Sequence, residues 1–191
     1  LNYVVCRVNV DGENYFIDAT SPFLPFGKLQ LKCYNGYARV MSEDTTVVNL
    51  SPDLLKETEF VNVNIQKGVD NSLEGYSINK KGFFKSLRVR EDIFNSSLDN
   101  YTEAYKTTFP GEVKILSIKI DSLASVQSNL AINTNFSINL FNGADVVYFN
   151  PMIGYGYKLN PFNNPVRNYP VELPYKQNEV FVFSMEIPDN Y

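Results

Sequence analysis

The chain has 191 residues, of which 44% are hydrophobic and 14% aromatic, so it can bury a core and is not a disordered segment. Its formal net charge of −4 argues against nucleic acid as a partner, because phosphate binding requires a concentration of basic side chains. The chain also contains no histidine, the side chain whose unperturbed pKa best suits a general base near neutral pH.

The same composition bears on membranes, metals and cofactors. No apolar run approaches the roughly 20 residues of a membrane span, so none is expected. With no histidine, and with Cys6 and Cys33 as the two thiols, zinc has no ligand set. No loop has EF-hand spacing, and only scattered carboxylates leave calcium open. We therefore expect no cofactor and assign no metal ligand.

The N-terminal part of the chain predicts short strands. Residues 3–10 alternate apolar with polar side chains, and Asp11-Gly12 is a strong signal for a hairpin into a strand over 15–18. Two prolines keep residues 20–27 out of a sheet, and residues 38–41 are a possible further strand. The segment 51–53, Ser-Pro-Asp, predicts a turn or a helix start and is the best candidate domain boundary.

Later strands are predicted over residues 61–65, 73–78, 113–120, 132–140 and 181–187. In the fourth of these, one face is apolar and the other carries mostly asparagine and serine, which is typical of an antiparallel sheet with one wet face. Between the last two, residues 150–174 are rich in Pro, Asn, Gly and Tyr and predict a long ordered loop.

Two helices are predicted between the second and third of these strands. Helical periodicity begins at Phe83, and a second helix is indicated by the 3.6-residue spacing of Phe94, Leu98, Tyr101 and Tyr105. Ser96 and Asp99 would cap its start, and residues 109–111, Phe-Pro-Gly, would end it. The fold class is therefore α+β, mainly antiparallel sheet with one or two short helices and a β-rich C-terminal region.

The cysteines and the basic residues have ordinary structural explanations. Cys6 alternates with three valines, so it is expected to be a small buried side chain; a Cys6–Cys33 disulfide and a reactive thiol are the alternatives. The main cluster of cations is expected to lie on a solvated helix face and comprises Lys80, Lys81, Lys85, Arg88 and Arg90.

Five tyrosines lie in or beside the predicted long loop: Tyr148, Tyr155, Tyr157, Tyr169 and Tyr175. Buried, they would pin the loop to the sheet, which is the expected role. Exposed, they would be stacking platforms for a glycan, with asparagines as hydrogen-bond partners.

Two blocks of sequence carry a resemblance to a known family. They are Tyr15-Phe16-Ile17-Asp18-Ala19-Thr20 with residues 21–27 and 33–40, and residues 160–162, 167–175 and 187–191. Together they resemble the C-terminal half of bacterial transglutaminase-like proteins, of the papain-like cysteine hydrolase superfamily, with flanking β-rich domains of unknown function. The likeness covers most of the chain in the same order.

The resemblance implies that residues 1–56 are the end of a partial transglutaminase-like domain and residues 57–191 a β-rich α+β domain. It also implies a fragment of a longer protein, with a signal upstream that directs it to the periplasm or cell surface. The implied partners are the upstream domains of its own parent chain, and an extracytoplasmic protein or glycan.

Active members of this family use a cysteine nucleophile, a histidine base and an aspartate that orients the imidazole. The match places the triad acid at Asp18 and Tyr3 at the histidine position, while neither Cys6 nor Cys33 inherits the nucleophile's position. A tyrosine, with a pKa near 10, is not a base at neutral pH, but its hydroxyl could donate a hydrogen bond to Asp18.

We therefore expect a non-enzymatic protein with a vestigial Asp18 and a structural or binding role outside the cytoplasm. One alternative is part of an active cysteine peptidase or amidase, with Asp18 as its triad acid and the base supplied elsewhere in the full protein. Another alternative is a carbohydrate-binding module.

Overall fold

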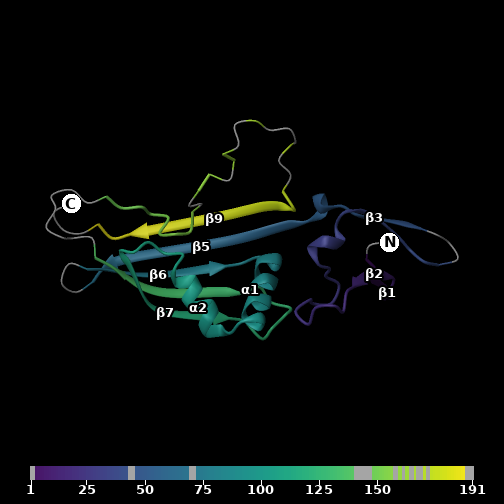
Figure 1. Cartoon of the computed structure of the whole chain (residues 1–191), viewed down its shortest axis with the longest axis horizontal. Coiled ribbons are helices and arrows are strands. Elements are labelled where there is room, and N and C mark those ends of the chain that lie inside the picture. The colour runs from purple at the N-terminus through teal and green to yellow at the C-terminus, as the bar shows by residue number, and fades with distance from the viewer. Residues whose placement is uncertain are drawn as a thin grey trace.

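The computed structural model describes residues 3–42, 46–68, 72–139, 148–156, 159–160, 162–163, 166, 170 and 173–187. Within these residues the chain is β-rich with two α-helices, and its sheets are mostly antiparallel, as an α+β fold requires. The molecule is elongated, with two short hairpins at one end and a five-stranded sheet at the other (Figure 1).

The first hairpin joins β1 (Cys6–Val10) to β2 (Glu13–Ile17), as the sequence predicted. Asp11 and Gly12 form its turn with φ of 53° and 87°, the left-handed conformation that a tight two-residue hairpin loop needs. After a 3₁₀ turn, η1 (Leu31–Cys33), a second hairpin pairs β3 (Gly36–Arg39) with β4 (Val47–Leu50). A small core of Leu29, Cys33 and Leu50 lies between the two hairpins.

Another 3₁₀ turn, η2 (Pro52–Leu54), leads into the five-stranded sheet, and the Ser51 hydroxyl caps it by accepting from the Asp53 amide. The sheet is built from β5 (Lys56–Lys67), β6 (Leu73–Lys80), β7 (Val113–Asp121), β8 (Ala131–Ile138) and β9 (Lys176–Met185). Its strand order is β7-β8-β6-β5-β9, and all neighbours are antiparallel except β5 and β9.

Strand β9 differs from the prediction in length and direction. It begins at Lys176 rather than at Phe181, and it runs parallel to β5. Its first four residues, Lys-Gln-Asn-Glu, lack the apolar alternation that marks a half-buried strand, because all four are exposed. Ladder hydrogen bonds to β5 hold this polar half in the sheet.

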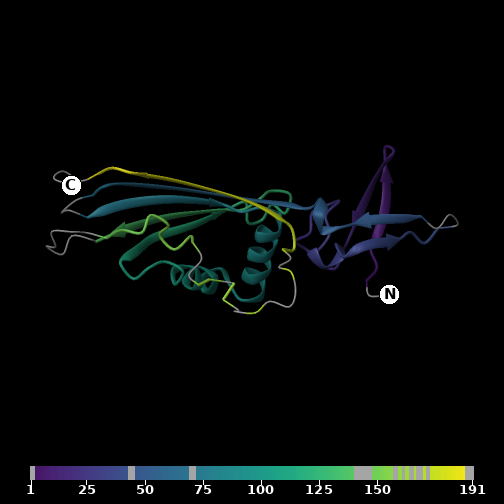
Figure 2. The ribbon, with the colours of Figure 1, turned by 90° about the horizontal axis from the view of Figure 1, so that it is seen from above.

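Helices α1 (Phe83–Asn95) and α2 (Leu98–Lys106) both lie on one face of the sheet, as the view along its edge shows (Figure 2). The predicted boundary between them was wrong. Phe94 belongs to α1, and the N-cap of α2 is Ser97, whose side chain accepts from the Asn100 amide. Ser96 instead closes α1, where both its amide and its hydroxyl donate to the Asp92 carbonyl.

The hairpin end of the molecule contacts α1 through side chains of residues 21–34. Phe23 packs edge-on against Phe94 with ring centroids 5.5 Å apart, and Tyr34 approaches Phe84 at 6.4 Å. The Ser21 hydroxyl also lies 3.4 Å from a carboxylate oxygen of Glu91. One helix therefore contacts both the sheet and the hairpins.

The main core fills the space between the sheet and the helices. Alternate residues of the strands point into it, which confirms the alternation predicted for the β5–β6 hairpin and for β8. Phe136 of β8 is fully buried, and its ring lies against β6 at Gly75, where a Cβ would overlap the ring. Gly75 is therefore required by packing rather than by backbone conformation.

We expect Gly75→Ala to lower the free energy of unfolding by about 2 kcal/mol or more, because the added methyl displaces a fully enclosed ring. Gly111→Ala is the matched control, since a Cβ there meets no atom within 4 Å. Urea unfolding of both variants measures the difference; equal stabilities would contradict the packing argument.

Candidate functional site

The two predicted site residues lie together at the hairpin end of the molecule. Asp18 follows β2 and is 5% exposed, and Tyr3 lies just before β1. The Tyr3 hydroxyl donates to Oδ2 of Asp18 at 2.7 Å, which confirms the predicted hydrogen bond. Oδ1 of the same carboxylate accepts from the Thr20 amide at 2.9 Å. Both carboxylate oxygens are thus engaged.

Two further residues, which the sequence did not single out, extend this unit. The Thr20 hydroxyl lies 2.7 Å from the Tyr3 hydroxyl. The Gln30 side-chain amide donates to the Thr20 hydroxyl at 3.1 Å. A phenol hydroxyl has one proton, and Tyr3 donates that proton to Asp18. The Thr20 hydroxyl is therefore the donor in its contact with the Tyr3 oxygen. The chain of donors therefore runs from Gln30 through Thr20 and Tyr3 to Asp18.

The electrostatics of this unit favour an ionised Asp18. Burial alone raises the pKa of the Asp18 carboxyl, but the hydrogen bonds from Tyr3 and Thr20 and the charge of Lys32 together outweigh it, so the pKa lies below its ordinary value. The Lys32 ammonium also lies over the Tyr3 ring, 4.2 Å from its centroid. The site is thus the Asp18 carboxylate held by a phenol hydroxyl and a backbone amide, neither of which acts as a general base at neutral pH.

Neither cysteine is arranged as a nucleophile beside Asp18. Cys33 is 7% exposed, and burial, followed by the Asp18 charge, raises the pKa of its thiol, which disfavours the reactive thiolate. Cys6 was expected to be buried and is exposed, like Val4, Val8 and Val10 of the same alternating set. The prediction was wrong because alternation marks one face of a strand but not whether anything covers that face. Both thiols are free, so the alternative of a disulfide is also wrong.

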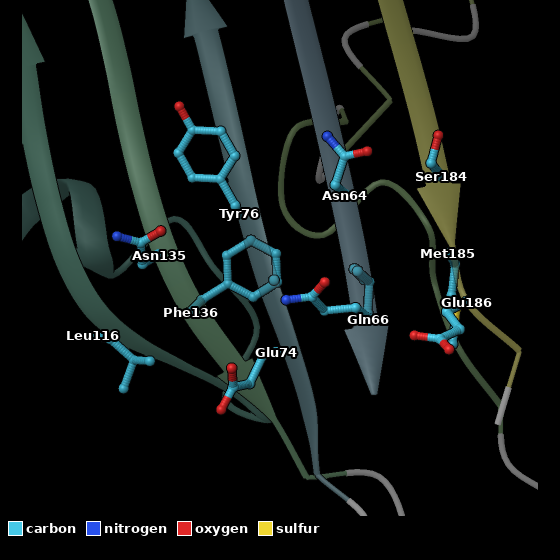
Figure 3. Close-up of a pocket in the computed structure, with 12 residues that line it drawn as sticks. Asn64, Gln66, Glu74, Tyr76, Leu116, Asn135, Phe136, Ser184, Met185 and Glu186 are labelled. Carbon is cyan, nitrogen blue, oxygen red and sulfur yellow. The ribbon is translucent and has the colours of Figure 1, made fainter. Parts of the chain in front are cut away.

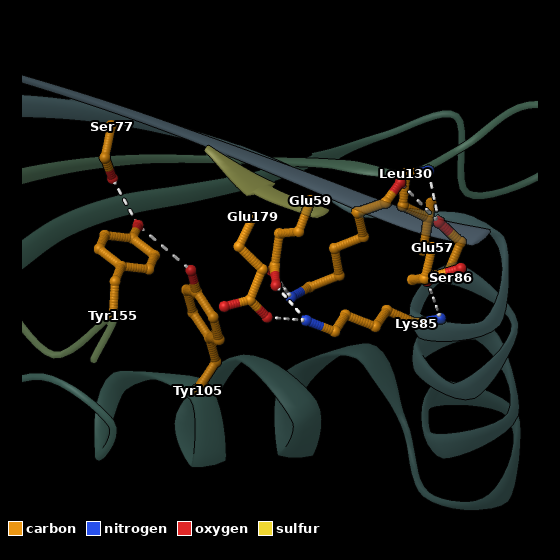
Figure 4. Close-up of polar contacts among 10 residues, drawn as sticks. Glu57, Glu59, Ser77, Lys85, Ser86, Tyr105, Leu130, Tyr155 and Glu179 are labelled. Atoms are coloured by element: carbon orange, nitrogen blue, oxygen red, sulfur yellow. Dashed lines mark hydrogen bonds and ion pairs between the residues drawn. The ribbon is translucent and has the colours of Figure 1, made fainter. Parts of the chain in front are cut away.

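The predicted solvated cluster of cations is wrong for three of its members. Lys81 pairs with Glu59 at 3.3 Å, and Lys85 pairs with Glu59 and, at 3.1 Å, with Glu179 (Figure 4). Burial alone lowers the pKa of Lys85, but these two carboxylates reverse the effect and raise it above its ordinary value. The prediction grouped these cations because they are close in sequence, whereas the carboxylates that bind two of them lie on β5 and β9.

Arg90 is the third member, and it is 2% exposed. Its guanidinium donates to four carbonyl oxygens of the β7–β8 connection, those of Ser122, Leu123, Ser125 and Ser128, at 2.6–3.2 Å. Burial lowers its pKa, yet an arginine stays charged in proteins. Arg90 thus fixes a loop, whereas Arg88, two residues away, is exposed.

The loop tyrosines divide between the two roles considered. The Tyr155 hydroxyl lies 2.7 Å from that of Ser77, and its ring packs edge-on against Phe109, so Tyr155 pins the loop to the sheet (Figure 4). Tyr175 stacks on Phe84 with centroids 5.3 Å apart. Tyr148 is 91% exposed and is not a pin. Tyr157 and Tyr169 lie outside the described residues.

Two absences apply to the described residues alone. No cluster of three or more metal-binding side chains occurs among them. No helix in the same part of the chain has the length and apolar character needed to cross a membrane.

Comparison with known proteins gives one match. A family profile described as "Domain of Unknown Function with solved-structure structure (DUF3858)" matches residues 145–191, the segment that contains β9. No curated protein matches the chain, and no solved structure matches it. The chain is therefore similar, over this segment, to a family to which no function is assigned.

We expect Tyr3→Phe to lower the free energy of unfolding by about 2 kcal/mol at neutral pH, because a buried carboxylate loses a donor. The folded-state pKa of Asp18 is depressed, so its contribution is present above the unfolded pKa of about 4 and is lost as the pH falls through the folded value. Urea unfolding between about pH 2.5 and 6 should therefore show a shallower acid limb in the variant; parallel curves would contradict the role of this bond.

We expect Arg90→Met to lower the free energy of unfolding by about 3 kcal/mol, because four carbonyls lose a charged donor. Arg88→Met removes the same charge from the exposed face of the same helix and should change stability by less than about 0.5 kcal/mol. Thermal unfolding of the two variants distinguishes the loss of the Arg90 bonds to the β7–β8 connection from a general effect of removing a charge.

Proposed function

We propose that this chain is a non-catalytic part of a transglutaminase-like protein, with a structural and binding role outside the cytoplasm. The observation that carries the proposal is the hydrogen bond from Tyr3 to Asp18. In an active relative the aspartate orients an imidazole, and in this chain a phenol occupies that oxygen.

The local geometry leaves little room for a replacement base. A histidine from elsewhere would have to reach a carboxylate that is 5% exposed and that already has a donor on each oxygen, the Tyr3 hydroxyl and the Thr20 amide. The unit is therefore better suited to joining the segments that precede β1, follow β2 and precede η1 than to proton transfer.

The exposed face of the first hairpin supports a partner at this end of the molecule. Every residue of β1 is exposed, and Val4, just before it, is 72% exposed. A two-stranded hairpin is marginal by itself in water and gains stability from further strands or a covering layer. The proposed occupants are the upstream domains of the parent chain, which the resemblance to transglutaminase-like proteins supplies.

The location in the periplasm or at the cell surface rests on the same resemblance.

The two rival functions have less support in the geometry. A cysteine peptidase or amidase needs a thiolate, and burial together with the Asp18 charge disfavours the thiolate of Cys33. For glycan binding by the long loop, Tyr155 is not available as a stacking platform, because its ring and hydroxyl are turned toward the sheet.

The proposal predicts that Asp18→Asn lowers the melting temperature by several degrees and changes no enzymatic activity. The assay is hydroxamate formation from a glutamine-containing peptide and hydroxylamine, the transamidation that an active transglutaminase catalyses. The full parent protein should give no turnover above that of its Asp18→Asn variant, because the rival interpretation takes its base from outside these 191 residues. Turnover that disappears in Asp18→Asn at an unchanged melting temperature would overturn the proposal.

A further inference from the structure

The face of the five-stranded sheet opposite the helices carries a groove of about 720 Å³ (Figure 3). The strands place its side chains there by alternation. Asn64 and Gln66 of β5 alternate with the buried Val63 and Ile65, and so point away from the core.

The strand register aligns five of the outward side chains in one row across all five strands. Asn64 pairs with Ser184 of β9 and with Tyr76 of β6, and Asn135 of β8 pairs with Tyr76 and with Ser117 of β7. Neighbouring strands lie about 4.8 Å apart, so the row presents polar groups at a regular interval perpendicular to the strands.

An aromatic ring lies at the centre of this row. Tyr76 is 37% exposed, and its hydroxyl donates to Asn133 at 3.0 Å. Asn133 in turn donates to Asp121 at 2.7 Å, so the ring is held from its far end. Figure 3 shows the ring lying across the sheet with its flat side toward the viewer, between Asn64 and Asn135. It offers an apolar plane flanked by amides.

The polar groups beside the ring are available to a ligand. Within the part of the chain that the structure describes, Asn64, Gln66 and Ser184 form no side-chain hydrogen bond. Asn135 donates one bond, at 2.8 Å, to the Ser117 hydroxyl. Side-chain amides both donate and accept, so they suit a ligand that does the same.

The charge of the groove narrows the class of ligand. Glu74 and Glu186 line it, and no lysine or arginine is among its described lining residues. An anionic ligand would be repelled by the two carboxylates, which can instead accept hydrogen bonds from hydroxyl groups. A ring plane, amides and carboxylates together suit a polyhydroxyl compound without negative charge.

We propose that this groove binds a neutral oligosaccharide, which lies across the strands with one sugar ring stacked on Tyr76. The site is separate from the tyrosine-rich loop and from the Tyr3–Asp18 unit, so the proposal goes beyond the non-catalytic role and does not depend on it. The carboxylates act as hydrogen-bond acceptors and take no part in bond cleavage.

The test is an array of neutral glycans probed with the 191-residue chain, followed by titration of a bound trisaccharide monitored through side-chain amide NMR signals. The signals of Asn64, Gln66 and Asn135 should shift. Tyr76→Ala should raise the Kd about tenfold, whereas Tyr76→Phe, which keeps the ring, should change it less than threefold. Tyr37→Ala is the control, since Tyr37 is 77% exposed on β3.

Each other outcome overturns the proposal. Hexalysine is titrated in parallel, and binding of hexalysine but of no saccharide would identify a site for a cationic peptide. If no glycan on the array binds and the melting temperature of the chain with each glycan is unchanged, the sheet face is a solvated surface with no ligand. Tyr3→Phe should bind as the unmodified chain does, so failure here and failure of the non-catalytic role are distinguishable.

Discussion

Two glutamates at the beginning of β5 hold the larger part of the molecule together. Glu57 is 2% exposed and accepts from the amides of Phe84 and Lys85, the second and third residues of α1. The amides at a helix start have no partner within the helix and carry partial positive charge, so a buried carboxylate is well matched to them. A Cβ at Gly82 would overlap the Glu57 carboxylate, so a larger residue there would have to move that carboxylate away from the two amides.

Glu59, two residues further along the same face, continues the junction. It binds Lys81, the residue after β6, and Lys85 in α1, and Lys85 also binds Glu179 of β9. Burial alone raises the pKa of Glu59, but the two lysines bring it below its ordinary value, so the carboxylate stays ionised. Ser86, also in α1, accepts from the Leu130 amide just before β8 (Figure 4). The first turn of α1 therefore binds β5, β9 and the residue that precedes β8.

The parts of this architecture that were predictable from sequence are those set by local chemistry. The Asp11-Gly12 turn and the alternation of Val61, Val63 and Ile65 each specify a hairpin without reference to distant residues. The charged partners were not predictable, because Lys85 and Glu179 are brought together only by the parallel pairing of β9 with β5. At the candidate site, the hydrogen bond from Tyr3 to Asp18 was predictable from the resemblance, while the contribution of Gln30 came from folding of η1.

The parallel pairing of β9 has a consequence for how the sheet assembles. Every ladder partner of β9 lies in residues 56–65, while the segment matched by the family profile begins at residue 145. In the part of the chain that the structure describes, β9 has β5 as its neighbour, and a pairing between strands so far apart along the chain has a high loop-closure cost. The matched segment therefore contributes an edge to a sheet whose other strands are encoded upstream of it.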